Sequence, residues 1–199
     1  EISLNTYKPF ACGIVEHPTI DGCIQLRNEH KLKAEDIESI SLKVHPLVLE
    51  LTGKKTPQVG LEGKFSVYHS AAVAIIHGAA GEAEYSDAVV RDPGVIALRD
   101  KVTATVDRGV HEDQAHVSIK LKNGKTLERF VEHAIGSLDK PMSDADLEAK
   151  FRGLCEGILS KAETEKLIRL CWDVARLKDA GEVARASVPV GKSVKRAAS

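Results

Sequence analysis

The sequence predicts an α+β fold, in which an antiparallel sheet with packed helices is followed by a helical hairpin. Alternating apolar and polar residues over 37–45, 101–107 and 115–122 are typical of strands that bury one face. Residues 65–77 instead form a helical pattern so rich in alanine that neighbours must pack closely on more than one of its faces. After Pro141 the spacing of apolar residues becomes helical, which predicts the hairpin.

The first elements along the chain are a helix and a strand. Pro18 suits the first turn of a helix, and apolar residues continue at helical spacing to about Glu29. A single helical turn at 34–37 then leads into the strand at 37–45, which Pro46 interrupts. These patterns place one helix ahead of the first strand.

The next segment connects that strand to the alanine-rich helix. Residues 47–51 predict either a second short strand or a helical turn. Proline and glycine make 53–63 a loop, and the helix at 65–77 follows it. Gly78 is expected to end this helix, because glycine adopts the left-handed conformation without strain.

The remaining strands and the hairpin complete the predicted order. Asn123 and Gly124 give the strongest short hairpin signal and join the strand at 115–122 to one at 125–133. With the strand at 101–107, they predict an antiparallel meander. The helical hairpin is expected at 143–158 and 162–178, and small and basic residues from 180 predict a flexible tail.

Composition argues against two kinds of partner. Lysine and arginine number 28 and aspartate and glutamate 29, so no net basic field favours nucleic acid. No apolar run approaches the roughly 20 residues that span a bilayer, so no membrane is expected.

Four scattered cysteines predict reduced thiols in a cytoplasmic protein. Three of them fall on apolar helix faces and are predicted to be core: Cys23, Cys155 and Cys171.

Chemically capable side chains gather at 63–69 (GKFSVYH), where the alanine-rich helix begins. Free N–H groups at a helix start, with a nearby lysine, can hold an anion. Successive helical residues point about 100° apart, so Lys64, Ser66, Tyr68 and His69 cannot all face one pocket. Ser66 and His69 share a face, and one of Tyr68 and His69 is therefore structural. Ser66 is either a ligand of the substrate or only the N-cap.

A second group lies at 8–18 (KPFACGIVEHP), where a restrained loop enters a helix. Lys8 can pair with an anion as a point charge, although most lysines are simply exposed. His17 is either an acid–base group with a pKa near neutrality or a capping residue. Cys12 either lines the pocket or packs. The histidines outside these two stretches show no metal-ligand spacing, so no metal site is predicted.

These stretches resemble landmarks of the MmgE/PrpD family. Residues 8–18, followed by an amphipathic helix, resemble the segment that opens the second domain of the family, and 63–69 resembles its second motif. Residues 92–95 (DPGV) and 143–151 (SDADLEAKF) are similar to later landmarks. The resemblance runs from about residue 5 to residue 160 in the expected order.

The resemblance implies an enzyme family that needs no cofactor and acts on small polycarboxylates. The family includes 2-methylcitrate dehydratase, cis-aconitate decarboxylase and iminodisuccinate epimerase, usually homodimers with the active site between a helical domain and an α+β lid. By this resemblance the chain is the C-terminal part, with the lid at 1–140, a helical hairpin at 141–179 that packs on the helical domain, and the tail at 180–199. The N-terminal helical domain supplies several catalytic residues, so the chain alone is expected to be inactive.

The resemblance also assigns roles to the two groups of residues. Members often carry a tyrosine at the position of His69, which favours a polar ring there. The expected reaction is proton abstraction beside a carboxylate, followed by dehydration, decarboxylation or epimerisation. The alternative is a non-enzymatic ligand-binding or protein-interaction module that retains the lid fold. The candidate catalytic residues are His17, His69 and Tyr68, and the candidate substrate-binding residues are Lys8, Cys12, Lys64 and Ser66.

Overall fold

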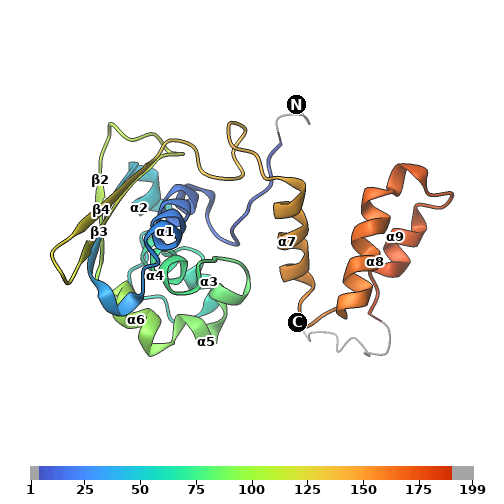
Figure 1. Cartoon of the computed structure of the whole chain (residues 1–199), viewed down its shortest axis with the longest axis horizontal. Helices are drawn as coiled ribbons and strands as arrows, with labels where there is room; N and C mark the ends of the chain where they lie inside the picture. Colours follow the sequence, from blue (N-terminus) through green and yellow to red (C-terminus); the bar gives the residue numbers. More distant parts are fainter. Residues whose placement is uncertain (1–4, 190–199) are drawn as a thin grey trace. The chain divides into compact units, whose positions relative to one another are not determined.

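The structure is a computed structural model of the chain and describes residues 5–189. The chain divides into two compact units, Glu1–Ser143 and Asp144–Ser199 (Figure 1). No helix within residues 5–189 has the length and apolar character needed to cross a membrane. The predicted tail at 180–199 lies only partly within the described residues.

A four-stranded sheet forms the centre of the first unit, with the strands in the order β2-β1-β3-β4. β1 pairs parallel with β2 and antiparallel with β3, and β3 pairs antiparallel with β4. In the centre of the sheet Ile40 lies opposite Ile119, and both side chains are fully buried. The strands are β1 (Ile37–Val44), β2 (Val102–Val106), β3 (Ala115–Leu121) and β4 (Thr126–Val131).

The α+β class is confirmed, but the prediction of a meander of three successive strands is wrong. β2 does not pair with β3, because β1 lies between them. β1 lies inside the sheet, where pairing on both edges satisfies its backbone groups. The β3–β4 hairpin forms where predicted, with Gly124 at a φ of 87° and the Asn123 side chain accepting from the Lys125 amide at 3.0 Å.

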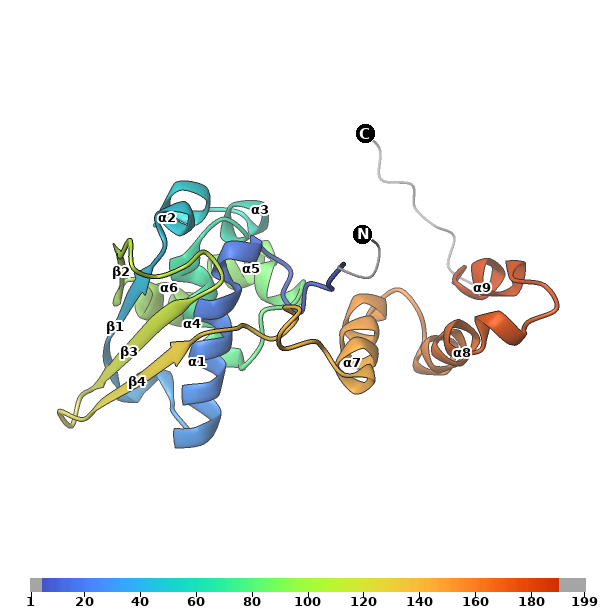
Figure 2. The same ribbon diagram turned by 90° about the horizontal axis from the view of Figure 1, so that it is seen from above.

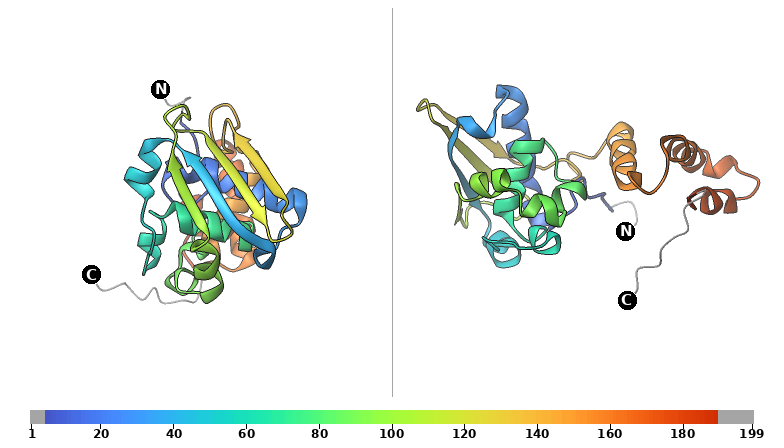
Figure 3. Two further views of the ribbon diagram at one scale, coloured as in Figure 1. Left: turned by 90° about the vertical axis from the view of Figure 1, so that its left-hand side faces the viewer. Right: turned by 90° about the horizontal axis from the view of Figure 1, so that it is seen from below.

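Helices cover one face of the sheet and leave the other open (Figure 3, left). α1 (His17–His30) lies beside β4 and packs against α4 (Val67–His77) (Figure 2). Gly22 lets α1 approach the sheet closely, since a Cβ there would lie 2.8 Å from Val117 Cγ2 of β3. The open face carries polar side chains such as Ser41 and Lys43, which are exposed. The core therefore lies between the sheet and the α1–α4 layer.

α4 is buried along most of its length, as its alanine content predicts. Each residue from Val67 to Ile75 is buried. Gly78 ends the helix with a φ of 70°, and Arg27 of α1 donates to the Ile75 carbonyl at 2.8 Å. The C-terminal end of this helix is therefore fixed by specific contacts.

Short helical turns connect these elements. Residues 47–51, for which the sequence allowed either a short strand or a helical turn, are helical. Pro46 stands at the first position of this helix, and His45 Nδ1 accepts from the Leu47 amide. α6 begins after Asp92, whose carboxylate accepts from two backbone amides. The turns are η2 (Ile14–Glu16), η3 (Ala34–Asp36), α2 (Pro46–Thr52), α3 (Gly60–Gly63), η4 (Ala83–Tyr85), α5 (Asp87–Val90) and α6 (Pro93–Arg99).

The second unit contains the predicted helical hairpin. Ser160 and Glu163 form a capping box at the start of α8, and Trp172 Nε1 donates to Glu148 of α7 at 2.8 Å. Cys171 is exposed, so its prediction as core is wrong: it lines an open apolar groove with residues of α7 such as Phe151, and this groove is not closed over. A short helix occupies part of the expected tail. The elements are α7 (Asp144–Cys155), α8 (Lys161–Trp172), η5 (Val174–Arg176) and α9 (Gly181–Ala186).

Candidate functional site

The two stretches that carry the candidate residues meet at Gly13. Its amide donates to the Lys64 carbonyl at 3.2 Å, which joins the loop before α1 to the segment before α4. A Cβ at Gly13 would lie 2.8 Å from Thr52 Cγ2 and 3.2 Å from Glu16 Oε1, so only glycine fits without rearrangement. Residues that are 51 positions apart (64 minus 13) are thus placed side by side.

Lys8 is exposed, unlike Cys12 and His17, the other candidate residues in 8–18. Its Nζ donates to the Cys12 carbonyl at 3.2 Å, which leaves the ammonium group with further donors for a ligand. Cys12 is buried, and burial, followed by the nearby Glu16 charge, raises the pKa of its thiol. Cys12 is therefore a neutral thiol at neutral pH, a packing group rather than a nucleophile.

His17 begins α1 and is buried. Its ring meets the ring of Phe10 edge to face, with the centroids 5.2 Å apart and the planes at 80°. Because Phe10 belongs to the loop that carries Lys8, the imidazole of His17 packs against this loop. The chemical role of His17, as an acid–base group or a capping residue, stays a prediction.

Ser66 and His69 share one face of α4, as the helical spacing predicts. The Ser66 hydroxyl accepts from the His69 amide at 3.1 Å, so Ser66 is the N-cap. His69 Nε2 lies 2.9 Å from the Glu84 carbonyl, which can only accept, so Nε2 carries the proton and Nδ1 the lone pair. Burial lowers the pKa of His69, and the Arg99 and His77 charges lower it further, which keeps this imidazole neutral at pH 7.

Tyr68 and Lys64 lie away from that face. Tyr68 is nearly buried, with Lys55 Nζ 5.7 Å from the centroid of its ring, and burial raises the pKa of the phenol. Lys64 Nζ lies 2.7 Å from Glu82 Oε2 in a partly exposed ion pair. The charge of Lys64 is therefore balanced within the chain, whereas Lys8 forms no ion pair within residues 5–189.

Three buried polar residues that the sequence analysis did not select complete the cluster. Ser70 Oγ and the Tyr85 hydroxyl lie 2.8 Å apart, and both side chains are buried. The Glu16 side chain has no exposed surface, and burial raises the pKa of its carboxyl well above the usual value. Ser70 lies one turn beyond Ser66, a spacing that signals a shared face, whereas no sequence signal points to Tyr85.

Tyr85 connects the two groups. Its ring lies 5.6 Å from that of His69, and its hydroxyl side adjoins Ser70 and the Cys12 thiol. The structure thus brings Cys12, Glu16 and His69 into one polar cluster, whereas Tyr68 lies on another side of α4. Among residues 5–189 no group of three or more histidine, cysteine, aspartate or glutamate side chains is placed to hold a metal ion.

A comparison with protein families matches the part of the chain that contains this cluster. The model of the MmgE/PrpD C-terminal domain matches residues 10–174, most of the chain. The chain belongs to the MmgE/PrpD family. The matched range includes the Gly13–Lys64 junction and covers most of the first unit and part of the second.

One curated protein shows a distant similarity to the chain. It is named 2-methylcitrate dehydratase, mitochondrial, and comes from Yarrowia lipolytica (strain CLIB 122 / E 150). The two sequences are 24% identical over 147 residues, covering 68% of this chain and 28% of that protein. The chain therefore spans less than a third of the length of this relative.

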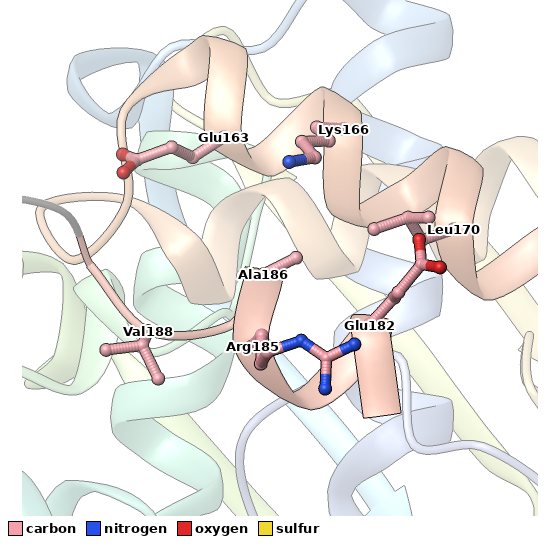
Figure 4. A pocket seen from close by; sticks show the side chains of 7 residues that line it. All are labelled: Glu163, Lys166, Leu170, Glu182, Arg185, Ala186 and Val188. Atoms are coloured by element: carbon pink, nitrogen blue, oxygen red, sulfur yellow. The ribbon is translucent and has the colours of Figure 1, made fainter. Parts of the chain in front are cut away.

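A separate pocket lies between α8 and α9 of this MmgE/PrpD chain (Figure 4). It has a volume of 230 Å³ and mixed charge, and no candidate residue from the sequence lines it. Arg185 on its wall bonds to Asp179 at 2.6 Å, so this guanidinium is already paired. The pocket shows no chemistry that would make it a competing site. Its lining residues are Glu163, Lys166, Leu170, Glu182, Arg185, Ala186 and Val188.

Proposed function

We propose that this chain is the C-terminal part of an MmgE/PrpD lyase or isomerase that acts on a small polycarboxylate. The observation that carries the proposal is the junction of the two family stretches at Gly13 and Lys64, with the Lys8 ammonium exposed beside it. An exposed cation in a restrained loop next to a buried polar cluster suits a ligand with a carboxylate group.

The proposed reaction starts with removal of a proton beside a substrate carboxylate. The carbanion that develops there needs nearby positive charge, and Lys8 supplies it. Dehydration, decarboxylation or epimerisation then follows, according to the substrate. His17, His69 and Tyr68 are the candidate acid–base groups in this chain. The bond from His69 Nε2 to the Glu84 carbonyl leaves Nδ1 of His69 as the atom that can accept a proton.

The proposed partner is the helical domain of the same family, in a homodimeric and cytoplasmic enzyme. An apolar groove of 140 Å³ on the second unit, lined chiefly by Leu147, Phe151 and Trp172, supports this assignment. Ile158 is 57% exposed and Trp172 54% exposed, which is unusual for side chains of this size. The four scattered cysteines, with no CxxC spacing, favour a reducing compartment.

An assay of two forms of the protein tests the proposal. We expect no turnover of 2-methylcitrate, cis-aconitate or iminodisuccinate by this chain alone, and turnover of one of them when the helical domain is supplied. In the active form Lys8→Met should lower kcat/KM by about 10- to 100-fold, the loss expected for one charge-assisted bond. Lys33→Met, a change at an exposed lysine of the same unit, is the control.

Two results would contradict this proposal. Turnover by the chain alone would show that the helical domain is not needed. Absence of turnover by the complete protein on all three substrates would count against a polycarboxylate lyase or isomerase. It would favour the alternative, a non-enzymatic module whose exposed apolar face on α7 and α8 binds another protein.

A further inference from the structure

Glu16 is a fully buried acid beneath the loop that carries Lys8. It occupies the last position of η2, directly before α1, and its side chain has no exposed surface. Neither carboxyl oxygen makes a hydrogen bond of normal geometry within the described residues. The Ser70 hydroxyl and the Gly13 backbone lie near enough to favour its charged form, but burial outweighs them. A buried carboxyl in such surroundings holds its proton at neutral pH.

Lys8 is the cation whose charge acts on this carboxyl. On its own segment Glu16 also faces Cys12, and from η4 it faces Tyr85; burial raises the pKa of both groups, so both are neutral near pH 7. The residues that α4 and α2 bring to this point are Ser70 and Thr52, which do not titrate. His17 follows Glu16 in the chain, but its ring packs on Phe10.

We propose that the proton on Glu16 keeps the Lys8 ammonium available for an anionic ligand, and that loss of this proton turns Glu16 into an internal competitor for Lys8. The inference rests on the proposed function, in which Lys8 binds a substrate carboxylate. It adds a regulating residue to that site: Glu16 acts through Lys8 and does not touch the ligand.

The coupling between the two groups must be reciprocal. The Lys8 charge lowers the pKa of Glu16, so an anion that cancels this charge lets Glu16 hold its proton more firmly. By the same linkage, a proton on Glu16 strengthens anion binding at Lys8. Affinity for a polycarboxylate should therefore be highest while Glu16 is protonated and should fall as pH rises through the pKa of Glu16.

Binding of tricarballylate, a tricarboxylate without a hydroxyl to eliminate, tests this coupling. Affinity is measured on the chain with the helical domain supplied, from pH 5 to pH 9 at constant ionic strength. The ratio of wild-type to Glu16→Gln affinity at each pH removes the titration of the probe itself. We expect this ratio to fall about fivefold or more across the range, the low end of common coupling between sites. Glu35→Gln, which removes an exposed carboxylate of the same unit, should match the wild type at each pH.

A second measurement needs no ligand. In the chain labelled with ¹³C at glutamate carboxyls, the Glu16 signal should titrate well above the other glutamates, and Lys8→Met should move its midpoint to higher pH. An unmoved midpoint would overturn the inference. A wild-type affinity whose pH dependence persists in Glu16→Gln would overturn it while leaving the proposed function intact. No binding by the wild type at any pH, or binding that Lys8→Met leaves unchanged, would overturn both.

Discussion

At the scale of single residues, the buried Glu16 carboxyl should make the stability of the chain depend on pH. Well below pH 4.5, the ordinary pKa of a glutamate, the folded and unfolded states both hold this proton. As pH rises, the unfolded chain releases the proton while the folded chain keeps it, because burial raises the pKa of Glu16 in the fold. The free energy of unfolding then falls by about 1.4 kcal/mol per pH unit until pH reaches the pKa of the folded state.

Glu16→Gln should remove this loss, since glutamine does not ionise. We expect the variant to melt at least about 2–4 °C above the wild type at pH 8, corresponding to about 1 kcal/mol in a chain of this size, and no higher at pH 4. Thermal unfolding followed by circular dichroism checks this, with Glu35→Gln as the exposed control. An equal difference at both pH values would show that Glu16 is not buried as a neutral acid.

The same residue shows what sequence reasoning reaches at this scale. The motif drew attention to Lys8, Cys12 and His17, and the structure places them in and beside one loop. Glu16 stands among them in the sequence, yet a glutamate is ordinarily exposed, and nothing local predicts its burial. Tyr85 joins the cluster through a contact across 15 residues with Ser70, which only the packed fold determines.

At the scale of elements, the first turn of α4 positions the face that Ser66, His69 and Ser70 share. Ser66 is fully buried, and its hydroxyl satisfies the His69 amide, which would otherwise lack a partner at the helix start. Ser66→Ala should therefore lower the free energy of unfolding by about 1–2 kcal/mol. The shift of the urea midpoint at unchanged slope measures this loss.

Ser86→Ala is the matched control for the cap of α4. Ser86 also caps a helix, but it is exposed, its hydroxyl lies 3.4 Å from the Val89 amide, and α5 is a single turn. We expect a loss of under about 0.5 kcal/mol there, as for most surface substitutions. Equal losses in the two variants would mean that burial of the Ser66 cap contributes nothing.

Sequence patterns identified the elements more reliably than their pairing. Period-two alternation located three of the four strands in residues 5–189, and the hairpin signal at Asn123-Gly124 located the fourth. The pattern does not say which strand pairs with which, and the expectation that successive strands are neighbours led to the wrong meander. β1 pairs with β2 on one edge and with β3 on the other, and this pairing is a property of the assembled sheet.

At the scale of the whole molecule, the two units differ in how much apolar surface each buries. The described part of the second unit buries few apolar side chains: Cys155, Leu167 and Ile168. A unit shorter than about 70–80 residues rarely gains more than about 3–5 kcal/mol from its core, and this one leaves Trp172 and Ile158 largely exposed. Its helices therefore depend on caps and ion pairs, such as that of Arg152 with Glu165.

Unfolding in urea should consequently occur in two steps. Trp172 is the single tryptophan of the chain and lies in the second unit, whereas the three tyrosines lie in the first. We expect tryptophan fluorescence to change at lower urea than tyrosine fluorescence of a Trp172→Phe variant, because the second unit has the smaller core. Adding the helical domain should shift Trp172 emission to shorter wavelength and move its transition to higher urea, since a ligand of the folded form stabilises it. Coincident transitions in the chain alone would show that the second unit does not need that domain for its stability, and unchanged emission after its addition would place the helical domain elsewhere than on the apolar groove.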